Sequence, residues 1–353
     1  MKISEIRKKI DRLDERMLLL LNRRARLARR IGRLKKRKNR PAYNPAREEK
    51  VIRRVLSLNQ GPLEADALGA IYREVISACR RQEQELKIAY LGPEATFTHE
   101  VALKQFGASA RYAAFESVES VFQEVEKEGA EFGVVPIENS LEGAVTYTLD
   151  MFVESDLKIC SELYLRVSHS LLSRVPFSRI KKLYSHPQVF GQCRRWLQQH
   201  LPHAELVPVA STAQAAQLAA EKKESAALAN PLAASVYGLR ILAERIEDST
   251  LNITRFLVIG RRLPKPSGHD RTSILFALPH RAGSLHDALV PCKRRGINLT
   301  KIESRPSKKK PWEYYFFVDI EGHIKDKKMK AALEELEKSC LFLKFLGSYP
   351  CAG

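Results

Sequence analysis

Apolar residues recur at helical spacing through the first 85 residues of the chain, and no part of this segment alternates as a strand would. The spacing predicts a first helix much longer than about 20 residues, which Asn39 and Pro41 end. Asn44-Pro45 has the N-cap and first-turn residues of a new helix that runs to about residue 59. A Gly61-Pro62 turn leads to a third helix over about 64–84. These helices cannot enclose the apolar stripe of the first, so we predict an intertwined dimer.

From residue 86 to about 264, short strand-like segments alternate with helical ones. The predicted strands are 87–92, 132–139, 181–186, 226–230 and 253–260, and helical patterns cover 117–129 and 212–223. This alternation is typical of an α/β domain with parallel strands. After a polar linker, residues 271–353 predict a ferredoxin-like βαββαβ module whose third strand spans 312–322. We therefore expect a multidomain chain: an all-α domain over 1–85, an α/β domain over 86–264 and an α+β domain over 270–353.

Composition limits the class of protein further. The 353 residues carry 60 Lys and Arg against 41 Asp and Glu, a formal net charge of +19, so we expect acidic partners. Six scattered cysteines without a CxxC pair argue against a disulfide framework or a zinc site. The amino terminus is charged and lacks an apolar signal region, and no apolar run is long enough to span a membrane. We expect a cytoplasmic protein without a metal site or membrane association.

The positive charge is concentrated in residues 22–40, where eleven of nineteen residues are Arg or Lys and none is acidic. Such a run is typical of nucleic-acid binding, but it can also surround a small acidic ligand. Arg24 and Lys35 lie eleven positions apart, so on a helix their side chains point within about 20° of each other. Both interrupt the apolar stripe, as Glu83 does on the third helix. Such charges either reach solvent at the rim or meet a charged partner or ligand.

These charged residues carry a resemblance to the all-helical chorismate mutases: Arg7 in EIRKKID, Arg24 in NRRARLA, Lys35 in IGRLKKR, Arg47-Glu48 in NPAREE and Glu83 in SACRRQE. The resemblance implies a pericyclic rearrangement of chorismate, a dicarboxylate, to prephenate. Catalysis then consists of positioning and charge stabilisation, without a cofactor. Arg24 and Arg47 would bind carboxylates, Arg7 would reach in from a partner subunit, Lys35 and Glu83 would flank the ether oxygen, and Glu48 would bind the substrate hydroxyl.

Three positions depart from the pattern of that family. Asn44 stands where an acid is frequent, and Cys79, which would also line the substrate site, stands where Ser is common. Glu83 stands where many relatives carry Gln. A carboxyl group can donate to an ether oxygen only when it is protonated.

In the central segment, polar residues follow the predicted strands: Glu138-Asn139-Ser140, Ser185-His186 and Asn230. Loops at the carboxyl ends of strands in open α/β sheets bind ligands, so these loops are expected to converge. Each residue, taken alone, fits a turn or a helix cap as well. The sequence contains no GxGxxG, Walker or GxSxG motif.

Four blocks in order resemble the prephenate dehydratases: YLGPEATFTHEVA (90–102), VVPIENSLEGAV (134–145), YSHPQVFGQC (184–193) and LNITRFLVIG (251–260). The resemblance implies two α/β lobes around a cleft, like the periplasmic binding proteins. It also implies loss of carbon dioxide and water from prephenate to give phenylpyruvate, without metal or cofactor. Thr254 would supply or position the proton, Asn139, Ser185, Gln192 and Phe256 would bind or orient prephenate, and Glu138 and Ser140 would shape the loop. Arg255 would be either a carboxylate anchor or an ion pair that bridges the lobes, and His186 would be structural.

Residues 279–306, PHRAGSLHDALVPCKRRGINLTKIESRP, resemble the ACT regulatory domains of prephenate dehydratases. The resemblance implies a homo-oligomer, dimer or tetramer, that binds phenylalanine as a feedback inhibitor. Gly283 and Leu285 would open a helix whose N–H groups receive the carboxylate, while Asn298 and Glu303-Ser304-Arg305-Pro306 would complete the site from the facing subunit. A purely structural dimerisation module is the alternative.

Together the blocks predict a bifunctional enzyme of phenylalanine biosynthesis that converts chorismate to prephenate and then to phenylpyruvate. Two alternatives stay open. One is a dehydratase whose helical domain is only a dimer arm, although the retained mutase residues argue against it. The other is a nucleic-acid-binding regulator that senses a ligand. Binding to phosphates would weaken steeply with salt, whereas a closed dicarboxylate pocket would respond mildly.

Overall fold

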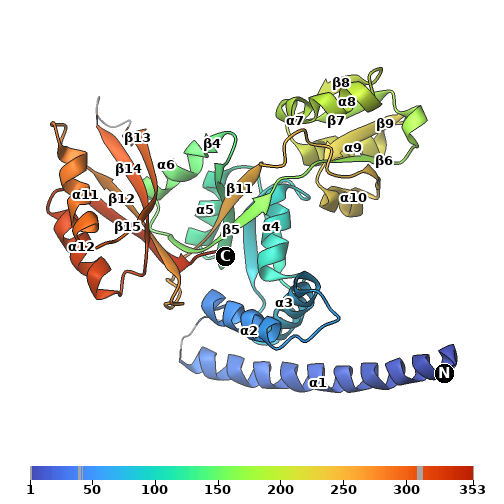
Figure 1. Ribbon diagram of the computed structural model, residues 1–353, viewed down its shortest axis with the longest axis horizontal. Helices are drawn as coiled ribbons and strands as arrows, with labels where there is room; N and C mark the ends of the chain where they lie inside the picture. The colour runs from blue at the N-terminus through green and yellow to red at the C-terminus, as the bar shows by residue number, and fades with distance from the viewer. Residues whose placement is uncertain (1, 39–40, 42, 308–312, 353) are drawn as a thin grey trace. The chain divides into compact units, whose positions relative to one another are not determined.

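The computed structural model describes residues 2–38, 41, 43–307 and 313–352. Asn39 and Trp312, where the sequence predicts a helix end and a strand start, lie outside the described residues. The chain forms two compact units, one of residues 1–87 and 103–111 and the other of residues 88–102 and 112–353. Figure 1 colours the chain from its blue N-terminal helices to its red C-terminal strand.

The first unit is built from α1 (Ile3–Arg37), α2 (Pro45–Ser57) and α3 (Ala65–Arg81). The predicted start of the second helix is correct: Asn44 caps α2 by accepting the N–H of Arg47 at 3.1 Å, and Pro45 follows the cap. The third helix ends two residues before Glu83, slightly earlier than predicted. The chain continues as a turn, because the N–H of Glu83 donates to the carbonyl of Arg80 at 2.8 Å.

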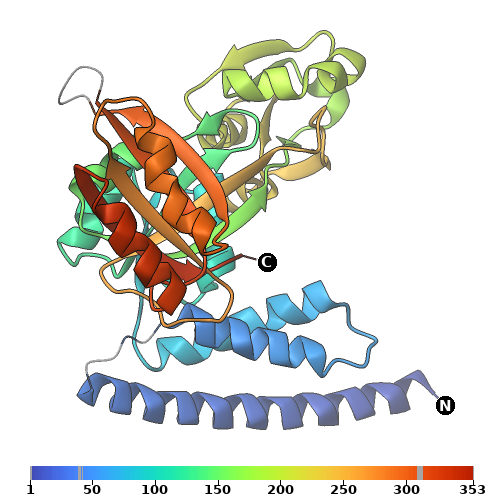
Figure 2. The same cartoon turned by 60° about the vertical axis from the view of Figure 1, so that its left-hand side comes forward.

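The long helix α1 leaves most of its apolar side chains exposed, and only Ala28 and Gly32 are buried along it. Figure 2 shows α1 running on well past α2 and α3 toward the amino terminus. The exposed apolar residues of α1 are Ile3, Ile6, Ile10, Leu13, Met17, Leu18, Leu19, Leu20, Leu21, Leu27, Ile31 and Leu34. A surface of this kind fits helix packing against a second copy, and the dimer stays a prediction.

The second unit contains two α/β lobes, as the sequence predicts. The first lobe has a sheet of order β2-β1-β3-β11-β5 with β4 paired to β3. Its strands are β1 (Lys87–Leu91), β2 (Arg111–Phe115), β3 (Phe132–Asn139), β4 (Gly143–Ala144), β5 (Lys158–Arg166) and β11 (Ile253–Gly260), and its helices are α4 (Phe97–Phe106), α5 (Val118–Glu126) and α6 (Thr146–Glu154). Residues 103–111, from the end of α4 to the start of β2, group with the first unit.

The strands of this sheet are not all parallel, which corrects the sequence-based expectation. β1 pairs with β3 in parallel, but β11 runs antiparallel to both β3 and β5. The reason is the path of the chain, because β5 leads out of the first lobe and β11 returns to it. The register pairs Thr254 with Asn139, so the start of β11 lies beside the end of β3.

The second lobe has the strand order β10-β6-β9-β7-β8. Its elements are β6 (Ser170–Ser173), a 3-10 turn (Phe177–Arg179), β7 (Lys182–Ser185), α7 (Pro187–Gln192), α8 (Arg194–His200), β8 (Glu205–Pro208), α9 (Thr212–Glu221), β9 (Ser225–Ala229), α10 (Pro231–Tyr237) and β10 (Arg240–Ala243). β7 is parallel to β8 and β9, and β6 is antiparallel to β9 and β10. Small alanine side chains on α9 are fully buried, which lets this helix pack closely.

The C-terminal part has the predicted βαββαβ order. Its elements are β12 (Asp270–Ala277), α11 (Ser284–Arg294), β13 (Leu299–Pro306), β14 (Tyr314–Glu321), α12 (Lys327–Glu337) and β15 (Phe342–Pro350), and the antiparallel sheet has the order β13-β14-β12-β15. Its apolar residues Leu275, Phe317 and Leu346 join Val135 and Ile159 of the first lobe in one buried cluster. The first lobe and the C-terminal part therefore share a hydrophobic core.

A close backbone approach holds this shared core together at Gly347. A methyl group added to Gly347 would lie 2.4 Å from the carbonyl oxygen of Ile159 on β5. We expect Gly347→Ala to destabilise the second unit by about 1–3 kcal/mol through overpacking. Thermal unfolding followed by circular dichroism should show a lower midpoint. The matched control is Gly191→Ala, whose methyl group would meet no atom within 4 Å. Equal midpoints for both variants would contradict the close approach.

Candidate active sites

A cavity of about 400 Å³ opens among the three helices of the first unit. It is lined by Arg24, Leu27, Ala28, Ile31 and Lys35 of α1, by Asn44, Arg47, Glu48 and Val51 at the start of α2, and by Ile76, Cys79, Arg80 and Glu83 in and after α3. All the residues predicted for a mutase site on one subunit therefore come together. Arg7 does not join them, because it lies on the exposed N-terminal part of α1.

Ion pairs occupy half of the cationic groups in this cavity. Lys35 Nζ lies 2.7 Å from Glu83 Oε2, and Arg80 Nη1 lies 2.7 Å from both carboxylate oxygens of Glu48. Burial raises the pKa of Glu48, while Arg80 and Lys35 act in the opposite direction. Within the described ranges, neither Arg24 nor Arg47 forms an ion pair, and Arg24 donates only to the carbonyl of Val75. The lining thus keeps an excess of two positive charges.

Arg80, whose side chain is only 5% exposed, was not predicted from the sequence. The sequence does contain a signal for Arg80. It lies four residues after Ile76 and three before Glu83, so it falls on the same side of α3 as both. Its carbonyl partner, Phe106, is distant in sequence, and that part of its environment could not be read from local periodicity.

Gly32 sets how closely α1 approaches the end of α3. A methyl group added there would lie 2.7 Å from Cα of Glu83 and 2.8 Å from its Cβ. Because the nearest atom belongs to the backbone, the helices would have to separate. Gly32 therefore maintains the short distance between Lys35 and Glu83.

A second candidate site lies between the two α/β lobes. A cleft there is lined by Leu141, Glu142, Gln188, Gly191, Gln192, Glu247, Asp248, Ser249 and Asn252. The amide nitrogen of Asn139 donates to Thr254 Oγ1 at 2.8 Å and to Asn252 Oδ1 at 2.7 Å. Asn252 donates in turn to Gln192 Oε1 at 3.3 Å. A hydrogen-bond chain therefore links three predicted residues, Asn139, Thr254 and Gln192, through Asn252.

Asn252 and His169 were not predicted, although Asn252 lies within the LNITRFLVIG block. His169 is buried, and its Nε2 lies 2.9 Å from Gln192 Oε1. Because an amide oxygen only accepts, Nε2 carries the hydrogen and Nδ1 is an acceptor with no partner among the described residues. Burial lowers the pKa of His169, which favours the neutral ring. The N–H of His169 also donates to Glu247 at 2.9 Å.

Of the predicted residues, Gln192 lines this cleft, Asn139 and Thr254 are connected to it through Asn252, and the others lie outside its lining. Ser140 fixes the loop after β3, because its hydroxyl donates to the carbonyl of Leu251 and accepts the N–H of Ile253. Ser185 is buried and donates to the carbonyl of Leu228, and Phe256 is packed in the core. His186 is the N-cap of α7 and Asn230 is the N-cap of α10, which agrees with the alternative that these residues belong to turns or helix caps.

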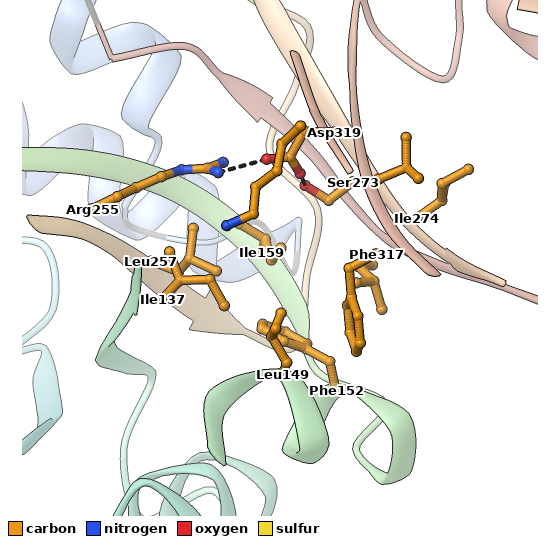
Figure 3. Close-up of a pocket in the computed structure, with 13 residues that line it drawn as sticks. Ile137, Leu149, Phe152, Ile159, Arg255, Leu257, Ser273, Ile274, Phe317 and Asp319 are labelled. Carbon is orange, nitrogen blue, oxygen red and sulfur yellow. Dashed lines mark hydrogen bonds and ion pairs between the residues drawn. The ribbon is translucent and has the colours of Figure 1, made fainter. Parts of the chain in front are cut away.

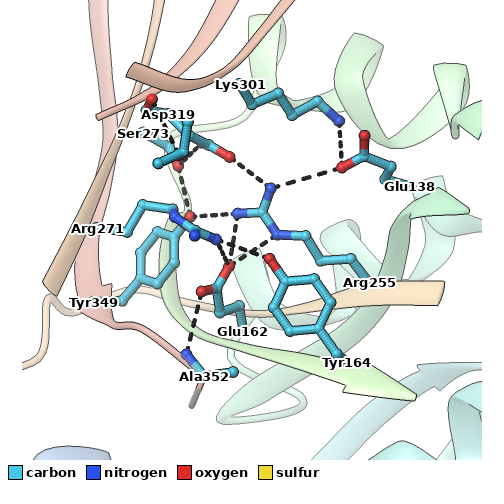
Figure 4. Close-up of polar contacts among 11 residues, drawn as sticks. Glu138, Glu162, Tyr164, Arg255, Arg271, Ser273, Lys301, Asp319, Tyr349 and Ala352 are labelled. Carbon is cyan, nitrogen blue, oxygen red and sulfur yellow. Dashed lines mark hydrogen bonds and ion pairs between the residues drawn. The ribbon is translucent and has the colours of Figure 1, made fainter. Parts of the chain in front are cut away.

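Arg255 lies on the opposite face of β11 from Thr254, because neighbouring residues on a strand face opposite sides. Its Nε donates to Glu162 at 2.8 Å, its Nη1 lies 2.5 Å from Asp319, and its Nη2 donates to the hydroxyl of Tyr349 at 3.0 Å. Figure 4 shows these contacts and the ion pair of Arg271 with the same Glu162. Burial alone would lower the pKa of Arg255, but Tyr349 and the carboxylates raise it. These ion pairs join the first lobe to the C-terminal domain and not to the second lobe, which corrects the lobe-bridging expectation.

Figure 3 shows a smaller cavity beside this network, lined mainly by apolar groups such as Ile137, Leu149 and Phe152. Its volume of about 20 Å³ leaves room for little more than a water molecule. It is a packing gap in the shared core rather than a substrate site. Across the described ranges, no group of three or more His, Cys, Asp or Glu side chains is arranged to hold a metal ion.

The predicted regulatory residues lie on two elements of the C-terminal domain. Gly283, with φ of +81°, precedes α11, and the residue that follows, Ser284, is buried. Glu303-Ser304-Arg305-Pro306 ends the edge strand β13, as predicted. Arg305 donates to Asp150 of α6 at 3.2 Å, and Lys301 lies 2.8 Å from Glu138. The strand β13 therefore holds the first lobe through two ion pairs. Leu285 packs against the domain core, and Asn298 is exposed.

A helical domain with a cationic cavity, a two-lobed domain with a cleft and a βαββαβ domain define an enzyme with two active sites and a regulatory module. The chain matches the family models of chorismate mutase type II over residues 6–84, prephenate dehydratase over 88–264 and the ACT domain over 272–338. The bifunctional chorismate mutase/prephenate dehydratase of Aquifex aeolicus is 50% identical over 99% of this chain and 98% of its own length. That of Pseudomonas aeruginosa is 44% identical over the same shares.

Among solved structures, the prephenate dehydratase of Arthrobacter aurescens in complex with L-Phe is 36% identical. It superposes with a TM-score of 0.69 and covers 75% of this chain and 90% of that one. This chain belongs to the family of bifunctional chorismate mutase/prephenate dehydratases. The enzyme interpretation is confirmed over that of a nucleic-acid-binding regulator. In the part of the chain that the structure describes, no helix has both the length and the apolar character to cross a bilayer.

The cavity of the helical domain depends on Gly32, so a methyl group there should damage one activity alone. We expect Gly32→Ala to lower mutase kcat/KM by about tenfold to a hundredfold, because it displaces Lys35 from Glu83. The gain in helix propensity of about 1 kcal/mol should keep α1 helical. Steady-state kinetics with chorismate measure the loss, and dehydratase activity on added prephenate serves as the internal reference. Gly69→Ala, with its nearest atom at 3.9 Å, is the matched control. Wild-type mutase activity in Gly32→Ala would contradict this role.

Proposed function

We propose that the cavity of the helical domain binds chorismate and that the cleft between the lobes binds prephenate, so that one chain catalyses two successive steps. The observation that supports the mutase assignment is the charge balance of the cavity. Among the described residues, two cations of the cavity form ion pairs with Glu48 and Glu83, and Arg24 and Arg47 do not, which matches a substrate with two carboxylates. A polyanion would need an open basic surface instead of a lined cavity.

In the mutase step, Arg24 and Arg47 bind the carboxylates and the ammonium of Lys35 donates to the ether oxygen. Lys35 suits this role because Glu83 holds it at 2.7 Å inside the cavity. Fixed charges of this kind stabilise the negative charge that grows on the ether oxygen in the transition state. Glu48 accepts the substrate hydroxyl, and Cys79 lines the wall. The apolar exposed face of α1 supports a second copy that brings its own Arg7 to the cavity.

In the dehydratase step, Thr254 directs a proton toward the leaving hydroxyl. Support comes from the direction of its hydrogen bond: Thr254 Oγ1 accepts from Asn139, so its own hydrogen remains available to a ligand. Gln192 and Asn252 face the cleft and bind prephenate, with His169 and Asn139 fixing their orientation. Neutral His169 keeps Gln192 oriented across a range of pH. Glu138, Ser140, Ser185 and Phe256 support the site without touching the substrate.

Phenylalanine binds at the ACT domain and inhibits the dehydratase. The resemblance of residues 279–306 and the L-Phe complex of a related dehydratase support this assignment. A ligand shifts an equilibrium only if it binds one arrangement better than another. The ion pairs of Lys301 and Arg305 with Glu138 and Asp150 give β13 direct contact with the dehydratase lobe, so a shift of this strand displaces the end of β3, which carries Asn139.

Chorismate supplied alone tests the two-step function. We expect purified wild-type protein at neutral pH to convert it to prephenate and then to phenylpyruvate, both followed by chromatography. Thr254→Val should accumulate prephenate, because loss of the proton donor costs about 10²–10⁴-fold in the second step. Thr254→Ser, which keeps the hydroxyl, should retain most of that activity. Rapid phenylpyruvate formation by Thr254→Val would contradict the role of Thr254.

Glu303 and Ser304 provide the test of regulation, because neither pairs with the dehydratase lobe among the described residues, whereas Arg305 does. We expect Glu303→Ala with Ser304→Ala to abolish inhibition by phenylalanine, measured against the same variant without phenylalanine. Arg305 stays unchanged because it pairs with Asp150. The matched control replaces an acid and a hydroxyl of the same domain away from β13, Glu334→Ala with Ser339→Ala. Equal inhibition of the double variant and the control would refute the site.

A further inference from the structure

We propose that Arg80 is a positioning residue of the mutase site, which holds Glu48 in one orientation and in its charged form. The inference rests on the mutase function proposed for the cavity. Arg80 donates from Nη1 to both carboxylate oxygens of Glu48 at 2.7 Å. Its side chain is 5% exposed, whereas that of Glu48 is 21% exposed. The carboxylate therefore meets the cavity on one side and a buried guanidinium on the other.

The guanidinium of Arg80 is itself fixed. Its Nη2 donates to the carbonyl of Phe106, which also accepts the hydroxyl of Ser77 at 2.7 Å. The ring centroids of Tyr43 and Phe106 lie 5.3 Å and 5.8 Å from its central carbon, close enough for cation–π attraction. Both rings are buried. An arginine held by a carbonyl and two rings cannot follow a moving carboxylate, so the carboxylate must take the place that Arg80 sets.

The other charged groups around Glu48 cannot replace Arg80. Lys35 on α1 is paired with Glu83, and Glu83 itself raises the pKa of Glu48 by like-charge repulsion. Arg47, which precedes Glu48 on α2, and Arg24 on α1 line the cavity, and neither pairs with Glu48 among the described residues. Within the described ranges, Arg80 is the ion-pair partner of Glu48. Removing it leaves a buried carboxylate beside Glu83, and such a group takes up a proton at higher pH.

Charge matters here because of the direction of the hydrogen bond. An ionised carboxylate only accepts, so it receives the hydrogen of a substrate hydroxyl. A protonated Glu48 would offer a competing donor. Arg80 acts through Glu48 and its guanidinium is occupied by protein groups, so it does not itself bind the substrate.

The test measures mutase kcat/KM from pH 5 to 9 in the full-length protein. Wild type should lose activity as the pH falls through the pKa of Glu48, because the acceptor becomes protonated. We expect Arg80→Met to lower kcat/KM at neutral pH by about tenfold to a hundredfold and to move this acid limb to higher pH. Arg80→Lys restores a charge, so its acid limb should return toward that of wild type. Dehydratase activity on added prephenate verifies folding in each variant.

A double-variant cycle separates positioning from a merely structural role. In Glu48→Gln there is no carboxylate to hold charged, so adding Arg80→Met should cost much less than it does in wild type. Full multiplication of the two losses, or an acid limb of Arg80→Met at the wild-type position, would overturn the positioning role while the mutase function stands. Absence of mutase activity in wild type would instead overturn the function and this inference together.

Discussion

The antiparallel pairing of β11 with β3 is the contact on which the dehydratase part of the molecule depends. Its register places Thr254 beside Asn139, and the amide of Asn139 reaches Thr254 and Asn252 at once. The same register turns the next residue, Arg255, to the other face of the sheet, where Glu162 and Asp319 hold it. One strand thus carries Thr254 on one side and the domain junction on the other. A shift of β11 by one residue would exchange the two.

Charge balance has the corresponding role in the helical domain. Each of two carboxylates, Glu48 and Glu83, engages one cation, and the remaining two arginines face the cavity. Burial makes every unpaired charge costly, so the cavity is suited to a ligand that brings the missing negative charges. The basic residues over 22–37 mostly lie elsewhere, on the exposed faces of α1.

Much of the fold could be predicted from local pattern. Asn44-Pro45 predicted the start of α2 because capping is a local interaction, and the βαββαβ order followed from its short, regular segments. The direction of β11 could not be predicted, because it depends on where the chain returns from the second lobe. β5 was missed because residues 159–162 are all buried and include Ser161 and Glu162, so its first half shows no alternation of apolar and polar residues.

The site residues, too, include some that local sequence pattern predicts and some that depend on distant contacts. Arg24, Lys35 and Glu83 were identifiable because each interrupts an apolar stripe. Arg80 and His169 were not, because the partners that define them, Phe106 and Gln192, are far away in sequence. The role of Arg255 could not be predicted because its partners, Glu162 and Asp319, lie 93 and 64 residues away in the sequence.

The shared core of the first lobe and the C-terminal domain means that the regulatory module is not a detachable appendage. Glu162 is completely buried, and one of its two arginine partners, Arg271, belongs to the C-terminal domain. A chain cut after the dehydratase domain would expose Val135 and Ile159 to water and leave Glu162 with half of its counter-charge. Evolution could therefore vary the effector that this module recognises far more easily than it could discard the module, since the catalytic lobe uses it as part of its own interior.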